Sequence, residues 1–226
     1  MQTTTYTPTS IEEIVFGNSK SKFIIDSLCN GTYPFPTDRS LGIILYGTYG
    51  TGKSTLASML PNAIENGYFG DNLGMQADTF FCEYGAHGQV ILNSISETLE
   101  KTAYMNASNR WHFILDEVDN LTASTQKTLK SILNSKYGVF VLTTNYIANL
   151  DRGLIDRCIL IEMNAPSVDQ IMPLAKRMAD DAGLVVDDAL MSNAIHRLNG
   201  SFRNLQSTVQ FVAHETKCTT ESSVTA

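Results

Sequence analysis

A glycine-rich run that ends in lysine and serine is the strongest chemical signal in this sequence. Residues 47–54 read Gly-Thr-Tyr-Gly-Thr-Gly-Lys-Ser, which is the phosphate-loop pattern G-x-x-x-x-G-K-[ST]. Glycines let backbone N–H groups turn toward a polyphosphate, and a following helix adds its positive dipole end. The nucleotide-binding residues predicted from this run are Gly47, Thr48, Tyr49, Gly50, Thr51, Gly52, Lys53, Ser54 and Thr55. Lys53 is expected to reach the outer phosphates of ATP, and the Ser54 hydroxyl is expected to bind Mg²⁺.

An acidic pair, Asp116 and Glu117, follows the short apolar run Trp111–Leu115. Such a run suits a central parallel strand that is covered on both faces. At the end of that strand, Asp116 would hold Mg²⁺ through its water shell, and Glu117 would orient and deprotonate an attacking water. A solvated pair of acids without chemistry is the alternative, but the phosphate loop in the same chain favours the catalytic interpretation.

A polar amide, Asn145, ends another apolar run, Val139–Thr144. Open α/β sheets bind their ligands in the crevice outside the carboxyl ends of the strands. Asn145 is therefore expected beside the phosphate loop, where it would hold the attacking water or the outermost phosphate. Together with Lys53 and Glu117, it completes a set of residues suited to hydrolysis of the phosphoric anhydride of ATP.

Strands and helices are expected to alternate along the first 165 residues. Apolar runs predict strands over Leu41–Tyr46, Thr79–Glu83, Trp111–Leu115, Val139–Thr144 and Cys158–Glu162. Helical periodicity is found over Ser19–Leu28, Asn93–Tyr104 and Thr122–Leu133. This alternation is typical of an α/β fold with a parallel sheet.

The pattern changes near residue 165, where strands are no longer predicted. Three amphipathic helices are expected over Ser167–Asp181, Val186–Leu198 and Ser201–His214. The predicted organisation is a frayed N-terminus (1–10), a P-loop ATPase domain (11–165), a helical lid domain (166–216) and a disordered tail (217–226). The tail is assigned as disordered because it is polar and has no apolar helical stripe.

Composition places the chain among ordinary globular proteins. It has 226 residues, of which 43% are hydrophobic and 17% are charged, and it carries a net charge of −7. That charge argues against tight non-specific binding of nucleic acid by the whole surface and leaves a local basic patch open. The sequence has no run of 18 apolar residues, and its polar first residues predict no signal peptide. Four scattered cysteines favour a reducing cytoplasm, or that of a host cell if the protein is viral.

The order of the motifs resembles that of AAA+ ATPases, and more narrowly that of clamp-loader small subunits of the replication factor C type and their bacteriophage relatives. The resemblance covers roughly residues 8–215. It includes the phosphate loop, with Tyr49 where proline is usual. It also rests on the entry segment Ser10–Gly17, the DEAD box as Asp116–Asp119, sensor 1 as Asn145–Tyr146, the Ser-Arg-Cys motif as Asp156–Cys158, and sensor 2 as Gly200–Arg203.

This resemblance implies the parts of the prediction that spacing alone does not supply. The sheet order would be 5-1-4-3-2, and a small all-α lid would follow. Val15 and Phe16 would lie over the adenine, and Arg203 would act in cis. Arg157 would act in trans, as the arginine finger of a neighbouring subunit in a homo- or hetero-oligomeric ring. The basic residues of the helix after the acidic pair, Lys127 and Lys130, would face DNA.

The resemblance therefore implies an ATP-hydrolysing AAA+ protein with ATP and Mg²⁺ as cofactors and a clamp-loader-like role in DNA replication. Its expected partners are a replication protein and primed DNA, with no membrane. We expect no collar domain, because the sequence ends shortly after the third lid helix. A helicase loader, another AAA+ remodeller of protein partners and a slowly hydrolysing nucleotide switch are the alternatives. Arg152 competes with Arg157 for the finger role, and a merely solvated helix face is the alternative for Lys127 and Lys130.

Overall fold

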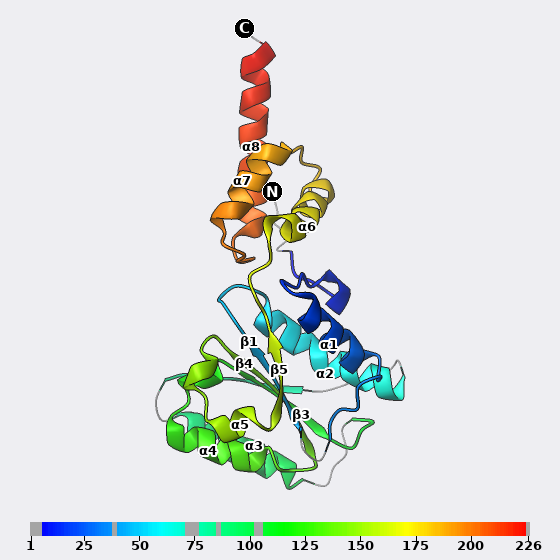
Figure 1. The fold of residues 1–226 in the computed structure, drawn as a ribbon, viewed down its shortest axis with the longest axis vertical. Coiled ribbons are helices and arrows are strands. Elements are labelled where there is room, and N and C mark those ends of the chain that lie inside the picture. The colour runs from blue at the N-terminus through cyan, green and yellow to red at the C-terminus, as the bar shows by residue number, and fades with distance from the viewer. Residues whose placement is uncertain (1–5, 38–39, 71–76, 85–86, 102–105, 225–226) are drawn as a thin grey trace. The chain divides into compact units, whose positions relative to one another are not determined.

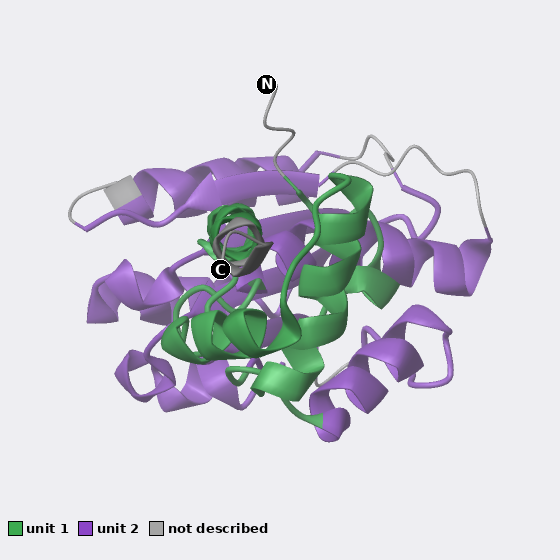
Figure 2. Cartoon of the chain, turned by 90° about the horizontal axis from the view of Figure 1, so that it is seen from above, with its two compact units in different colours: residues 1–18, 48–52, 164–226 green, residues 19–47, 53–163 purple. Residues whose placement is uncertain are grey.

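The chain folds into two compact units. A computed structural model describes residues 6–37, 40–70, 77–84, 87–101 and 106–224, with residues 219–224 described by their backbone alone (Figure 1). One unit, here called the lid unit, contains residues 1–18, 48–52 and 164–226 (Figure 2). The other, the sheet unit, contains residues 19–47 and 53–163. The lid unit therefore takes in parts of the N-terminal segment and of the phosphate loop, which the sequence placed in the ATPase domain.

The sheet unit is built on five parallel strands. These are β1 (Gly42–Tyr46), β2 (Ala77–Phe81), β3 (Trp111–Asp116), β4 (Gly138–Thr144) and β5 (Cys158–Glu162). Their order is β2-β3-β4-β1-β5, which confirms the order implied by the family resemblance. The second strand lies two residues before the predicted range and is mostly exposed, as an edge strand can be. The central strands β1 and β4 are almost entirely buried.

Helices cover both faces of this sheet (Figure 1). They are α1 (Ser19–Cys29), α2 (Lys53–Phe69), α3 (His87–Leu99), α4 (Ala123–Ile132) and α5 (Arg152–Ile155). The helices α3, α4 and α5 share one core with the sheet, at whose centre Phe113 stacks on Phe140 with ring centroids 5.3 Å apart. The predicted helix Asn93–Tyr104 begins earlier, at His87, and ends at Leu99, while residues 102–105 lie outside the described residues.

The lid unit contains the three predicted helices, α6 (Val168–Asp181), α7 (Asp188–Arg197) and α8 (Leu205–Val224), around a core of their own. Helix α6 starts with a capping box, in which Ser167 and Gln170 bond each other's backbone. A short 3-10 helix, η1 (Ile11–Glu13), lies in the N-terminal segment of this unit.

Both predictions of disorder are wrong where the chain is described. Helix α8 continues to Val224, because extending an existing helix costs far less than starting one, even without an apolar stripe. The N-terminal segment is held from Tyr6 onward, since the Tyr6 N–H donates to Oε1 of Gln206 at 3.0 Å. Residues 1–5 and 225–226 lie outside the described residues. Among the helices that are described, none has both the length and the hydrophobicity needed to cross a bilayer.

Candidate nucleotide-binding and catalytic site

The phosphate loop lies between the end of β1 and the start of α2, as the sequence predicts. Three of its glycines have positive φ: Gly47 at 144°, Gly50 at 76° and Gly52 at 86°. A Cβ atom at Gly47 would clash with the carbonyl oxygen of Met163, so a side chain is excluded there. Lys53 is 7% exposed, and its Nζ donates to the Gly47 carbonyl at 3.0 Å. The lysine is therefore folded over the loop from the first turn of α2.

Asp116 ends β3 and lies at the centre of a hydrogen-bonded cluster. Both of its carboxylate oxygens lie 2.9 Å from the Ser54 hydroxyl, and Oδ1 also accepts from the Thr143 hydroxyl. Asp116 and Thr143 are 9% and 2% exposed. One carboxylate and one hydroxyl are the hard oxygen ligands that Mg²⁺ takes when nucleotide phosphates and water complete its shell. The cluster therefore suits the ion predicted for Ser54 and Asp116.

Glu117 has a backbone conformation that few residues other than glycine adopt. Its φ is 59° and its ψ is 49°, in the left-handed region. Its N–H donates to the Thr143 hydroxyl at 3.0 Å, and that same hydroxyl donates to Asp116. One threonine of β4 thus orders both acids. Sequence reasoning missed Thr143, although the pair Thr143–Thr144 at the end of an apolar strand was a visible signal.

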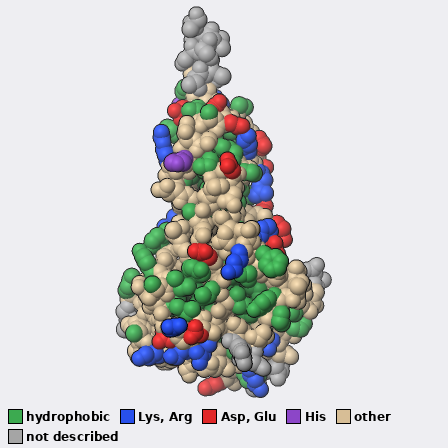
Figure 3. Space-filling view, in the orientation of Figure 1, with side chains coloured by type: hydrophobic (Ala, Val, Ile, Leu, Met, Phe, Trp, Pro, Cys, Tyr) green, Lys and Arg blue, Asp and Glu red, His purple; other side chains and the backbone are tan. Residues whose placement is uncertain are grey.

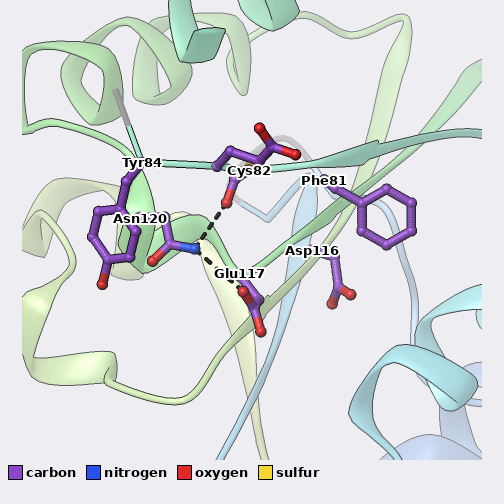
Figure 4. A pocket seen from close by; sticks show the side chains of 7 residues that line it. Phe81, Cys82, Tyr84, Asp116, Glu117 and Asn120 are labelled. Carbon is purple, nitrogen blue, oxygen red and sulfur yellow. Dashed lines mark hydrogen bonds between the residues drawn. The ribbon is translucent and has the colours of Figure 1, made fainter. Parts of the chain in front are cut away.

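A pocket of about 440 Å³ opens beside the acidic pair (Figure 4). The residues that line it are Phe81, Cys82, Glu83, Tyr84, Asp116, Glu117 and Asn120. Nδ2 of Asn120 donates to the Cys82 carbonyl at 2.8 Å and to Oε2 of Glu117 at 3.2 Å. Asn120 therefore ties the Glu117 carboxylate to the end of β2, a contact that the sequence did not suggest.

Cys82 lines this pocket, and its thiol would be a nucleophile if it were deprotonated. Burial, and then the charges of Asp116, Asp119 and Glu117, raise the pKa of its thiol to about 12. At neutral pH it is therefore a protonated thiol, and thiolate chemistry is not its role.

Asn145 follows β4 directly, and the sheet register shows where that places it. Thr144 pairs with Tyr46, so Asn145 and Gly47 leave neighbouring strands at the same edge of the sheet. Asn145 is half-buried. The register therefore places Asn145 beside the start of the phosphate loop, where the sequence predicts it.

The two arginines considered for the finger role lie near α5. Arg157 donates from Nε to Oδ1 of Asn134 at 3.0 Å and from Nη1 to the Gly153 carbonyl at 2.7 Å. Its described partners are therefore neutral groups of its own subunit rather than the carboxylates of Asp151 or Asp156. Arg152 is exposed at the start of α5.

The lid unit brings the sensor 2 segment to the middle of the phosphate loop. The Phe202 N–H donates to the Gly50 carbonyl at 2.8 Å, and a Cβ atom at Gly50 would clash with the Ser201 side chain. Arg203 comes next and is exposed. In the same unit Phe16 is buried, Val15 is half-buried, and the Phe16 carbonyl accepts from Nε2 of Gln170 at 3.2 Å.

Lysine and arginine side chains gather over α4 and α5 on the face shown in Figure 3. The two lysines predicted to face DNA differ, because Lys127 is exposed while Nζ of Lys130 lies 3.3 Å from Oδ1 of Asp151. Desolvation would raise the pKa of Asp151, but hydrogen bonds from Lys130 and from the backbone of Leu154 and Gly153 together lower it. The charge of Lys130 is thus already engaged by an ionised carboxylate.

A phosphate loop after β1, an acidic pair at the end of β3 and a strand order of 2-3-4-1-5 define a P-loop ATPase of the AAA class. Comparison with family models agrees with this assignment. The family described as "AAA domain (dynein-related subfamily)" matches residues 42–178. The chain belongs to this AAA family.

Curated relatives include replication factor C small subunits. Replication factor C small subunit 2 of Pyrobaculum islandicum is 24% identical over 224 residues, which cover 97% of this chain and 65% of that protein. The replication factor C small subunit of Aeropyrum pernix is 23% identical over 223 residues, which cover 96% of this chain and 64% of that one. The chain therefore spans slightly less than two thirds of the length of these relatives.

Solved structures share the fold at low sequence identity. The RuvB Holliday junction branch migration motor of Thermotoga maritima has a TM-score of 0.66 and is 17% identical, with 90% of this chain and 63% of that chain covered. Domain III of the replication initiation protein DnaA from the same organism has a TM-score of 0.60 and is 14% identical, with 90% and 87% covered. Both share the fold of this chain.

Proposed function

We propose that this AAA ATPase binds ATP with Mg²⁺, hydrolyses its terminal anhydride bond and uses the reaction in a clamp-loader-like step of DNA replication. The observation that carries the ATPase part is the hydrogen-bonded cluster of Ser54, Asp116 and Thr143. The replication part is supported by the similarity of nearly the whole chain to replication factor C small subunits.

Phosphoryl transfer to water is mainly a matter of positioning and charge neutralisation. In the proposed site, the loop N–H groups and Lys53 hold the outer phosphates. Ser54 and Asp116 hold Mg²⁺, which supplies positive charge to the phosphates when it is bound. Asn145 orients the attacking water, and Glu117 accepts its proton.

The lid unit supplies the remaining contacts of the proposal. Arg203 acts in cis as a further cation, and its location next to two residues that meet Gly50 supports this role. Val15 and Phe16 form the wall against the adenine. Along the chain, residues 48–52 of the phosphate loop belong to the lid unit, and Gly47, Lys53 and Ser54 belong to the sheet unit.

Arg157 is proposed to act in trans in a ring of subunits, and subunit mixing tests this. Arg157→Ala should leave ATP binding unchanged and lower turnover, by as much as ~10³-fold for a full arginine finger. Mixed with Lys53→Ala subunits, it should recover part of the activity at interfaces where a wild-type Arg157 meets a wild-type loop. Mixed assembly without recovery would assign Arg157 to its own subunit, and an equal effect of Arg152→Ala would favour Arg152.

DNA contact is proposed for α4, and the structure ranks its two lysines. Lys127 is exposed, while Lys130 is paired with Asp151. Each lost phosphate contact should reduce the salt slope of DNA binding by about 1. Lys127→Ala should show this loss in ATP-bound oligomers, and Lys130→Ala should show less of it. Equal DNA affinity of the double variant and the wild type would exclude this surface.

The function as a whole is tested by ATP turnover of the protein alone, with primed DNA, and with primed DNA and a ring-shaped replication clamp. Lys53→Ala serves as the control that lacks nucleotide binding. Strong stimulation that needs DNA and clamp together is expected. Stimulation by a protein partner without DNA would indicate a helicase loader or another remodeller. Negligible turnover with nucleotide-dependent oligomerisation would indicate a switch.

A further inference from the structure

The N-terminal segment Tyr6–Phe16 lies on the lid helices and is here called the strap. At its start, the Tyr6 N–H donates to Oε1 of Gln206 on α8 at 3.0 Å. At its end, the Phe16 carbonyl accepts from Nε2 of Gln170 on α6 at 3.2 Å. Tyr6 and Val15 also pack against the apolar core of the lid unit. The strap is thus fixed at both ends to different helices of one unit.

Arg177 of α6 contacts the strap at two further points. Its Nη2 donates to the Tyr6 hydroxyl, and its guanidinium carbon lies 5.5 Å from the centre of the Tyr6 ring. The same nitrogen is 3.7 Å from Oε1 of Glu13. Oε2 of Glu13 in turn accepts from the Thr9 N–H at 2.7 Å. A single guanidinium therefore fixes the path of the strap through both an aromatic and an acidic side chain.

We infer that Arg177 is a positioning residue for the nucleotide base, because it sets the path of the strap that ends in Val15 and Phe16. This inference rests on the proposed function, which assigns those two residues to the adenine. The phosphates are held by other residues, those of the loop and Lys53. Loss of Arg177 should therefore weaken recognition of the nucleoside part of ATP and leave recognition of its triphosphate part unchanged.

The adjacent residue of α6 offers a matched control. Nζ of Lys176 lies 2.6 Å from Oδ2 of Asp188, so this exposed pair joins α6 to α7 without involving the strap. Lys176→Gln and Arg177→Gln each remove one positive charge and one ion pair from the same turn of one helix. Only the second change removes contacts to the strap.

The test compares two ligands, ATP and inorganic tripolyphosphate. Arg177→Gln should raise the Kd for ATP about tenfold, an effect the size of one or two lost contacts, and change the Kd for tripolyphosphate by less than about twofold. At saturating ATP, kcat should stay within about twofold of the wild type. Arg177→Lys, which keeps the charge toward Glu13, should recover part of the ATP affinity. Lys176→Gln should change neither Kd.

The rate at which a protease cleaves the strap provides a second measurement. A glutamate-specific protease cleaves after Glu12 and Glu13, and Arg177→Gln should be cut there faster than Lys176→Gln. Glu13→Gln should reproduce the selective loss of ATP affinity from the strap side of the same contact, which keeps the test valid if the arginine variant folds poorly.

Three results would overturn the inference. These are unchanged ATP affinity in Arg177→Gln, an equal loss of affinity for both ligands, or the same loss in Lys176→Gln. A failure of the proposed function looks different, because Lys53→Ala would then bind ATP as well as the wild type does.

Discussion

The cluster around Asp116 in the sheet unit and the strap of the lid unit are held in place by opposite means. Asp116 and Thr143 are nearly buried and bonded to each other and to Ser54. The strap is clamped by Arg177 and Glu13, whose side chains are 44% and 27% exposed. Buried hydrogen bonds fix one geometry because breaking them leaves polar groups unsatisfied, whereas exposed ion pairs contribute little and are screened by salt. The comparison suggests rigid chemistry on the sheet and adjustable substrate recognition on the lid.

Glu117→Gln should have the largest effect on turnover. If it had no effect, the assignment of rigid chemistry to the sheet unit would be wrong. Removing the general base should lower turnover by about 10²–10⁴-fold, while ATP binding is kept because the loop is untouched. Single-turnover hydrolysis and equilibrium binding of ATP measure the two quantities separately. Glu83→Gln is the control, since Glu83 lines the same pocket and should leave turnover unchanged. Wild-type turnover in Glu117→Gln would show that another group handles the water.

Thr143→Val should follow in size. It removes the hydroxyl that bonds both Asp116 and the Glu117 N–H, so turnover should fall about 10–10²-fold, and stability should fall by about 1–3 kcal/mol from the unsatisfied groups. Turnover at saturating ATP and the free energy of unfolding measure these effects.

The neighbouring threonine supplies the control for this change. The Thr144 hydroxyl donates to Oδ1 of Asp119 at 2.6 Å and accepts from the Tyr146 N–H at 3.0 Å. Thr144→Val should lose comparable stability and keep turnover within about threefold. If both variants lost turnover equally, Thr143 would be acting only through stability.

These two threonines show where sequence reasoning ends. The phosphate loop and the acidic pair were predictable from local sequence patterns, and the strand order was implied by the resemblance to AAA+ ATPases. The roles of Thr143 and Asn120 depend on which side chains meet across neighbouring strands. The secondary-structure propensity of a residue does not report such contacts. Arg177 was hidden for the same reason, since its partner Tyr6 is 171 residues away. The polar tail was misjudged because helix propagation needs no apolar face.

Asn120→Ala should lower kcat less and tests how firmly the Glu117 carboxylate is held in the sheet unit. Without the amide that ties it to the Cys82 carbonyl, the Glu117 carboxylate gains other rotamers, so kcat should fall about 3–10-fold, the usual weight of one hydrogen bond. The Kd for ATP should not change. Asn120→Asp should lower kcat further, because a second carboxylate would repel Glu117. An unchanged kcat in both variants would show that the left-handed backbone alone positions Glu117.

Glu65→Gln should have the smallest effect on catalysis and tests whether burial of polar groups by itself implies chemistry. Glu65 and His112 are each 2% exposed, and Nε2 of His112 lies 2.6 Å from Oε1 of Glu65, near the start of β3 and far along that strand from Asp116. Burial would raise the pKa of Glu65, but hydrogen bonds from His112 and Ser108 lower it below its ordinary value of 4.5.

Because the folded state favours the ionised Glu65, its contribution to stability is complete above about pH 4.5 and is lost as the pH falls through the lowered pKa. Glu65→Gln should therefore cost about 1–3 kcal/mol at pH 7 through the weakened pairing of His112 and Ser108. Its free energy of unfolding should then fall less steeply than that of the wild type between pH 5 and 3, as urea unfolding at each pH would measure. Turnover per folded molecule should stay at the wild-type level. A large loss of turnover would instead show that Glu65 and His112, near the start of β3, support catalysis at the other end of that strand. The rigid part of the site in the sheet unit would then extend along the whole of β3.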